Sequence, residues 1–144
     1  MLARGTRPAG GRGRLGAVSD GLSPAREAAS AAAAELVEPG MALGLGSGRA
    51  VWRVVERLGE RYGGGGADGL RVTVASERTR ERAREAGLQV VELDGTLELD
   101  LALDGADEID PELRLIKGGG GALLREKIVA SAARRFVVVA ETPK

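Results

Sequence analysis

The chain has 144 residues, and its 21 Lys and Arg are balanced by 21 Asp and Glu, so the formal net charge is zero. This balance argues against nucleic acid as a partner, because phosphate backbones select basic faces. The absence of Cys and His excludes thiol and imidazole catalysis and Cys- or His-ligated zinc. No apolar run reaches the roughly 18–20 residues of a membrane span, so we expect no membrane partner and a cytoplasmic location.

Residues 1–21 are rich in Gly and Arg and nearly free of acids. We expect a disordered tail there, because the segment has too little apolar content to build a core. A transit peptide is the alternative, since such peptides are Arg-rich and acid-poor. Residues 22–144 are expected to form a single domain.

Helices and strands alternate along residues 22–144. Pro24 suits the first position of a helix, and the hydroxyl of Ser23 suits its N-cap. Apolar residues recur with a helical period in residues 50–62, whereas they alternate as in a strand in residues 70–75. In chain order, we expect a helix over 24–38, a strand over 41–46, a helix over 50–62, a strand over 70–75, a helix over 77–86 closed by Gly87, strands over 88–93 and 99–104, a helix over 120–133 and a strand over 135–140.

This alternation is typical of α/β proteins, and we expect a three-layer, Rossmann-like domain with a mostly parallel sheet. Ligands bind beyond the carboxyl ends of the strands in such sheets. Four segments with polar or glycine residues follow predicted strands, namely Gly44–Gly48, Ser76, Asp104 and Lys144. We therefore expect them to gather at one edge of the sheet as a candidate site.

The glycine loop GLGSGRA, residues 44–50, lies between a predicted strand and a predicted helix. Its spacing matches neither the dinucleotide fingerprint GxGxxG nor the P-loop, because no Gly-Lys-Ser/Thr follows. Two interpretations are left. The loop is a cradle for phosphate or carboxylate at a helix N-terminus, or it is a tight turn that needs glycine for packing.

The segment DGADEID, residues 104–110, concentrates acidic side chains after a buried strand. Its spacing does not match a calcium loop, and we expect no metal site. An acidic surface turn is one interpretation. The other is an acid and base pair, because crowded carboxylates push their pKa values apart.

The segment KGGGGALLREK, residues 117–127, places a lysine before a run of glycines and a predicted helix. Lys117 is either a surface lysine or a cation that stabilises a developing oxyanion. On a helix, Glu126 points away from Leu124 and Ile128, which we take as the apolar face. Glu126 is therefore either a solvated residue or a general base that faces a cleft.

Taken together, SERT (76–79), DGADEID and KGGGGALLREKIVAS (117–131) resemble the signatures of type A ribose-5-phosphate isomerases. The resemblance extends from about residue 24 to the end of the chain. It implies interconversion of D-ribose 5-phosphate and D-ribulose 5-phosphate through an enediolate, in the non-oxidative branch of the pentose phosphate pathway. It also implies that no metal or organic cofactor is needed and that the full-length protein is a homodimer.

By motif position, the resemblance assigns four catalytic residues. Glu126 resembles the base that moves a proton between the two sugar carbons, and Asp104 the residue that assists ring opening. Asp107 and Lys117 resemble the groups that hold and stabilise the C1 and C2 oxygens. The implied substrate-binding residues are Arg26, Ser47, Gly48, Arg49, Ala50, Ser76, Thr79, Gly105, Ala106, Gly118, Gly119, Gly120 and Lys144.

The chain departs from the family pattern in two places. Gly48 is followed by Arg49 and Ala50 where the family has Ser-Thr, so two phosphate-facing hydroxyls are missing. We expect Arg49 to replace them partly with a forked charge contact, against the steric effect of its bulk. The C-terminal lobe of the family is not part of the chain.

Two other functional interpretations stay open at this point. A sugar-phosphate deaminase or an acyl-coenzyme-A transferase resembles the same fold, although the lysine–glycine block argues against both. A non-catalytic sugar-phosphate-binding module, or a truncated inactive relative, is the alternative outside catalysis. Arg49, Ala50 and the missing lobe favour that alternative.

Overall fold

The computed structural model describes residues 2–5, 23–65, 69–117 and 121–141. The helices are α1 (Pro24–Glu35), α2 (Arg49–Tyr62), α3 (Glu77–Glu85) and α4 (Leu123–Ser131). The strands are β1 (Leu2–Gly5), β2 (Ala42–Leu45), β3 (Arg71–Val74), β4 (Gln89–Val90), β5 (Leu101–Asp104), β6 (Glu108–Ile109), β7 (Leu115–Ile116) and β8 (Phe136–Glu141). Within these ranges, every helix is too short or too polar to span a lipid bilayer.

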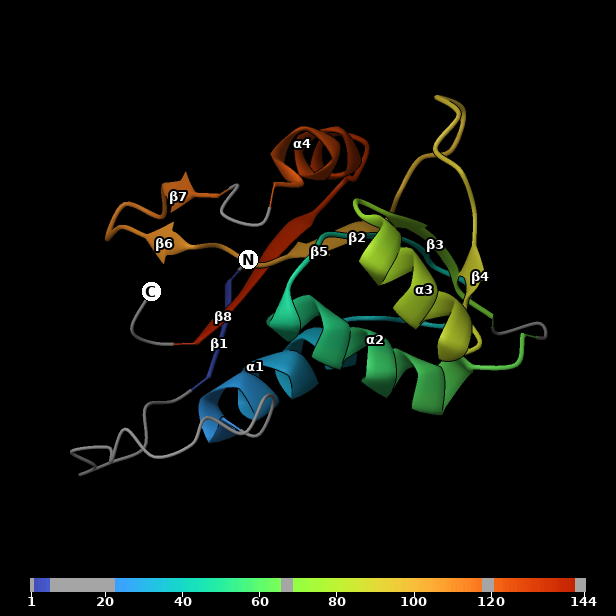
Figure 1. The fold of residues 1–144 in the computed structure, drawn as a ribbon, viewed down its shortest axis with the longest axis horizontal. Helices are drawn as coiled ribbons and strands as arrows, with labels where there is room; N and C mark the ends of the chain where they lie inside the picture. The colour runs from blue at the N-terminus through green and yellow to red at the C-terminus, as the bar shows by residue number, and fades with distance from the viewer. Residues whose placement is uncertain (1, 6–22, 66–68, 118–120, 142–144) are drawn as a thin grey trace.

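Six parallel strands form the main sheet in the order β1-β8-β5-β2-β3-β4, and β6 and β7 form a separate antiparallel pair (Figure 1). The chain runs outward from β2 through β3 and β4, then crosses to the other side of β2 with β5 and β8. The switch point therefore lies between β2 and β5, the place where ligands bind in open α/β sheets. The parallel sheet confirms the expected Rossmann-like α/β fold.

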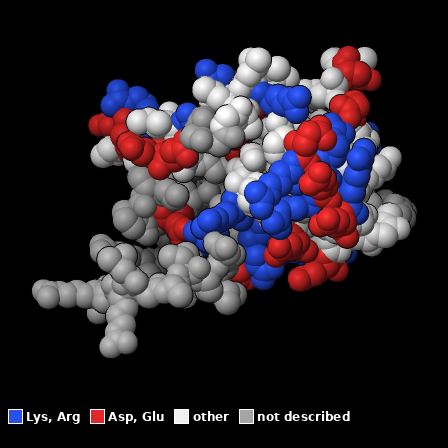
Figure 2. All heavy atoms as spheres, in the orientation of Figure 1, with Lys and Arg blue, Asp and Glu red and all other residues white. Residues whose placement is uncertain are grey.

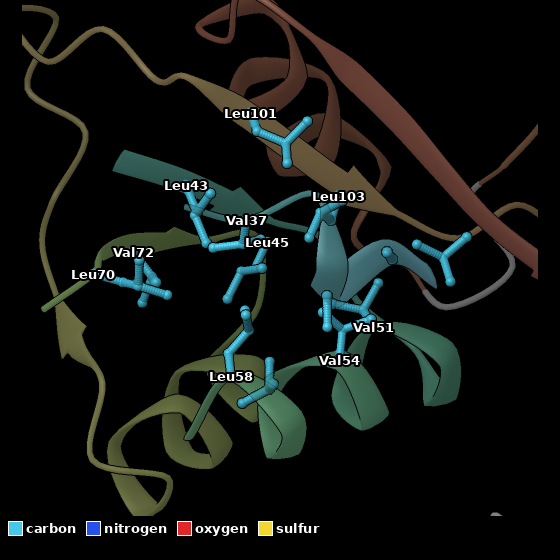
Figure 3. Close-up of a cluster of buried hydrophobic side chains, with 14 of the residues drawn as sticks. Val37, Leu43, Leu45, Val51, Val54, Leu58, Leu70, Val72, Leu101 and Leu103 are labelled. Atoms are coloured by element: carbon cyan, nitrogen blue, oxygen red, sulfur yellow. The ribbon is translucent and has the colours of Figure 1, made fainter. Parts of the chain in front are cut away.

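Helices cover both faces of the sheet, as expected for three layers, but they cover them unequally (Figure 1). The larger core lies beneath α1, α2 and α3, where Leu43, Leu45 and Leu103 of the sheet meet Val51 and Leu58 of α2 (Figure 3). On the other face, α4 contributes Val129 to a small cluster made by the residues Ala42, Ala75, Leu99 and Val129. Helix α4 is thus attached through few apolar contacts.

The helix ends follow the chemistry of their capping residues. Ser23 and Ser76 accept hydrogen bonds from the amides of Arg26 and Thr79 and cap α1 and α3. Gly87 has a φ of 79°, a left-handed conformation that favours glycine. It closes α3, as expected, because Leu88 N donates to Ala83 O at 3.0 Å in the 6→1 bond of a Schellman motif.

Three parts of the fold differ from the sequence-based expectation. Residues 2–5, placed in the disordered tail, pair as β1 with β8, because the edge of β8 offers unpaired backbone groups to any extended segment. Residues 6–21 lie outside the described residues. The strand expected over 88–93 is only Gln89–Val90, and the polar loop after Asp104 contains the β6-β7 pair. Elements of two residues are too short to show a period.

Candidate active site

A cavity of about 520 Å³ opens beyond the carboxyl ends of β2, β5 and β8. The glycine loop with the start of α2, the segment after β5 and the end of β8 supply most of its wall. Its lining residues are Arg26, Ser47, Gly48, Arg49, Ala50, Trp52, Arg78, Gly105, Ala106, Asp107, Lys117, Glu126, Val139, Ala140 and Glu141.

Asp104 ends β5 immediately behind this cavity and is 3% exposed. Its Oδ1 accepts hydrogen bonds from the amides of Gly105 at 2.7 Å and Ser47 at 3.3 Å. Its Oδ2 lies 2.8 Å from Lys117 Nζ. Burial raises the pKa of the Asp104 carboxyl, and the hydrogen bond and positive charge of Lys117 oppose that rise. The carboxylate therefore holds the glycine loop and the lysine in fixed positions.

Lys117 connects Asp104 with Glu126. Besides Asp104, its Nζ donates a hydrogen bond to the carbonyl oxygen of Gly105. Glu126 Oε2 lies 3.6 Å from Nζ, which is beyond hydrogen-bonding distance. The ammonium group of Lys117 therefore lies between two carboxylates, and it is closer to Asp104 than to Glu126.

Glu126 is buried, with 8% of its surface exposed. Its Oε2 has no hydrogen-bond partner within the described part of the chain. Burial raises the pKa of this carboxyl, the negative charge of Asp104 raises it further, and Lys117 opposes the rise. A buried carboxylate with unused lone pairs and a raised pKa is suited to accept a proton.

The orientation of α4 corrects one sequence-based inference. Glu126 does point away from Leu124 and Ile128, but those two side chains are 73% and 52% exposed, so they do not form the buried face. Glu126 and Val129 face inward instead. Periodicity places Glu126 opposite the two apolar residues, but it does not say which side of the helix meets the sheet.

Hydroxyl and indole groups join the glycine loop to α3. Thr79 is fully buried; its Oγ1 donates to Gly46 O at 2.8 Å and accepts from Trp52 Nε1 at 3.0 Å. Ser76 Oγ donates to Ser47 Oγ at 3.2 Å. Ser76 and Thr79 therefore brace the loop from behind, and neither lines the cavity.

The backbone of Gly46 lies close to the side chain of Asp104. A Cβ at this position would lie 2.0 Å from Asp104 Oδ1, so a side chain and the carboxylate cannot occupy their present places together. Gly46→Ala is expected to lower the free energy of unfolding by about 1–3 kcal/mol, measured by denaturant unfolding. Gly105→Ala is the control, because its Cβ would approach nothing closer than 3.9 Å. Equal stability of the two variants would contradict this steric account.

The structure brings most of the predicted residues together. Ten of them line the cavity, namely Arg26, Ser47, Gly48, Arg49, Ala50, Gly105, Ala106, Asp107, Lys117 and Glu126. Asp104 lies behind them, and Ser76 and Thr79 lie behind the glycine loop. Gly118, Gly119, Gly120 and Lys144 lie outside the described residues.

Sequence reasoning missed three polar or aromatic lining residues, Trp52, Arg78 and Glu141. Glu141 Oε1 accepts from Arg26 at 2.6 Å, so a carboxylate neutralises that predicted phosphate contact. Glu141 lies at the end of β8, and its position after a predicted strand could have identified it as a candidate site residue. Trp52 and Arg78 belong to helical segments, and only packing shows which side of each helix borders the cavity.

The acids of residues 104–110 do not converge. Asp104 faces Lys117, whereas Asp110 Oδ2 pairs with Arg114 Nε at 2.5 Å. In the described ranges, no group of three or more Asp and Glu side chains is arranged to hold a metal ion.

A second, more open groove of about 740 Å³ lies between α4 and residues 93–98. Its lining contains one carboxylate, Glu98, which pairs with Arg134 at 2.6 Å, and one lysine, Lys127. None of the residues that line this groove is a buried acid or base, so the first cavity is the better candidate for an active site.

Comparisons with known proteins point to one family. The family model described as ribose 5-phosphate isomerase A (phosphoriboisomerase A) matches residues 71–144. The ribose-5-phosphate isomerase A of Nitrobacter hamburgensis is 52% identical over 125 residues, which cover 85% of this chain and 52% of the relative. That of Ruegeria is 51% identical over 132 residues, covering 88% and 49%. The chain spans about half the length of the curated relatives it matches.

Solved structures lead to the same group. A D-ribose-5-phosphate isomerase in complex with phospho-erythronic acid superposes with a TM-score of 0.72 and 35% identity, covering 78% of this chain and 49% of that one. The ribose 5-phosphate isomerase of Plasmodium falciparum gives a TM-score of 0.72 and 37% identity, covering 78% and 48%.

Proposed function

Because the chain belongs to the ribose 5-phosphate isomerase A family, we propose that it interconverts D-ribose 5-phosphate and D-ribulose 5-phosphate. The observation that carries the proposal is the cluster of Asp104, Lys117 and Glu126 beside a cavity that begins at a glycine loop. Such a cluster offers a base, a cation and backbone amides, which is what proton transfer next to a carbonyl requires.

Glu126 is the proposed base. Its carboxylate takes the proton from C2 of the open-chain aldose, the C–H electrons form the C1–C2 double bond, and negative charge moves to O1. The protonated Glu126 then delivers a proton to C1, while the C2 hydroxyl loses its proton to O1 and becomes the ketone. The raised pKa of Glu126 supports this role, because a more basic carboxylate abstracts a carbon-bound proton more readily.

Lys117 is the proposed electrophile. Its ammonium lines the cavity near Glu126 and is held by Asp104 at 2.8 Å, so the charge that develops on O1 or O2 meets a cation that needs no reorganisation. Asp107 also lines the cavity and is proposed to hold the sugar oxygens. Ring opening by Asp104 stays a prediction from the family resemblance, since both Asp104 oxygens already contact protein groups.

The phosphate is proposed to bind at the N-terminus of α2, where Gly48, Arg49 and Ala50 line the same cavity. A related protein is solved with phospho-erythronic acid, a compound that carries both a carboxylate and a phosphate. Its two anionic groups would meet Lys117 and the glycine loop of this chain. Residues 22–144 form the proposed catalytic domain; a homodimer and a cytoplasmic location follow from the family resemblance.

The test is turnover of ribose 5-phosphate by this chain in D₂O, followed by NMR. We expect ribulose 5-phosphate to form with partial deuterium at C1, because a carboxylate base that shuttles the proton exchanges it with solvent. Activity is expected to survive exhaustive chelation, and unphosphorylated ribose is the control substrate. Binding of ribose 5-phosphate without turnover would identify a non-catalytic sugar-phosphate-binding module instead.

A further inference from the structure

Arg78 lies in the first turn of α3 and lines the cavity together with residues at the start of α2. Its guanidinium carbon is 4.5 Å from the centroid of the Trp52 ring. Stacking on an aromatic face leaves the N–H donors at the edge of the guanidinium free for a planar or tetrahedral anion. The side chain is therefore oriented before any ligand arrives.

The ring beneath Arg78 is itself fixed to the glycine loop. Trp52 Nε1 donates to Thr79 Oγ1, which in turn donates to the carbonyl of Gly46. Arg78 stacks on Trp52 and directly precedes Thr79 in the chain, so two members of this hydrogen-bonded path hold Arg78 relative to the loop. A guanidinium placed this way costs little side-chain entropy on binding.

Arg78 also differs from its neighbours in charge pairing. Arg82 stacks on the same ring at 4.7 Å but pairs with Glu56 at 3.6 Å, and Arg80 pairs with Glu92 at 2.6 Å. Figure 2 shows this alternation of basic and acidic side chains over α2 and α3. Within the described part of the chain, Arg78 makes no ion pair, and it is the member of the group that lines the cavity.

We propose that Arg78, held on Trp52, binds the phosphate of the substrate from the α3 side of the cavity. This inference rests on the proposed function and adds a specificity residue to it. It also accounts for the missing Ser-Thr pair after Gly48, because a guanidinium makes two charge-assisted hydrogen bonds to a phosphate. Arg26 is less suited to the same task, since Glu141 already neutralises it.

The experiment compares Arg78→Ala with Arg82→Ala, a matched control that removes the other arginine from the same ring. Kd is measured calorimetrically for ribose 5-phosphate, inorganic phosphate and ribose, and KM and kcat by turnover. For Arg78→Ala we expect KM and both phosphate-ligand Kd values to rise about tenfold or more, with kcat and ribose binding nearly unchanged. Arg78→Lys should recover part of the loss. Arg82→Ala should match the parent, and thermal unfolding checks that all variants fold.

Two outcomes would overturn the inference. One is equal phosphate affinity in Arg78→Ala, Arg82→Ala and the parent chain, and the other is no phosphate binding by the parent. A parent that binds phosphate through Arg78 but does not isomerise ribose 5-phosphate would support this inference and reject the isomerase function. The experiment can therefore reject phosphate binding by Arg78 and the isomerase function independently of each other.

Discussion

Glu126→Gln is expected to reduce kcat for ribose 5-phosphate isomerisation by about 10²–10⁴ while KM changes little. The amide keeps the shape of the side chain but cannot accept the C2 proton. The parent activity should rise with pH through a pKa above the ordinary glutamate value of 4.5, because burial and the charge of Asp104 raise it. The measurement is a kcat/KM profile between pH 4 and 9 for both proteins, with Glu81→Gln, an exposed helix position, as the control.

Glu126→Gln is expected to lower activity but to raise stability. This combination distinguishes a catalytic role of Glu126 from a structural one. Because the pKa of Glu126 is raised in the folded state, the folded chain holds this proton more strongly than the unfolded chain does. Ionisation therefore lowers the free energy of unfolding as the pH rises above 4.5. Glu126→Gln is expected to unfold at a higher temperature than the parent at pH 7 and to lose that advantage near pH 4. Normal turnover by the variant would reject Glu126 as the base.

Lys117→Met is expected to abolish turnover and to lower the free energy of unfolding by about 3–5 kcal/mol at neutral pH. It removes the cation within 2.8 Å of Asp104 and 3.6 Å of Glu126, so two buried carboxylates are left facing each other. Denaturant unfolding at low temperature measures the loss. Lys127→Met, at an exposed position on α4, is the matched control, and Lys117→Arg tests whether charge alone is sufficient.

The loss in Lys117→Met should depend on pH in a defined direction. Without the lysine, the pKa of Asp104 rises further above its ordinary value of 3.8, so the folded variant binds more protons than the unfolded one. Its stability then falls as the pH rises above 3.8 and recovers in acid. A deficit that is the same at pH 4 and pH 7.5 would contradict the assignment of Lys117 as the counter-ion of the two carboxylates.

Local sequence patterns were sufficient for most elements of the main sheet and its helices. The apolar period of residues 50–62 predicted α2, and Val51, Val54 and Leu58 are buried as that period requires. Gly87 predicted the end of α3. The alternation of helices and strands predicted a parallel sheet, and this implied the convergence of Ser47, Ser76 and Asp104 at one edge. These features depend on residues close together in the chain, whose backbone preferences act without distant partners.

Only the tertiary structure decided which polar groups meet and which helix faces are buried. Periodicity put Glu126 opposite Leu124 and Ile128, but the packing of α4 on the sheet turned the carboxylate inward and left the two apolar residues exposed. The ion pair of Arg26 with Glu141 joins positions 115 residues apart, and the stacking of Arg78 on Trp52 joins two helices. Short-range patterns carry no information on such contacts, because the layer packing of the sheet and its helices sets these distances.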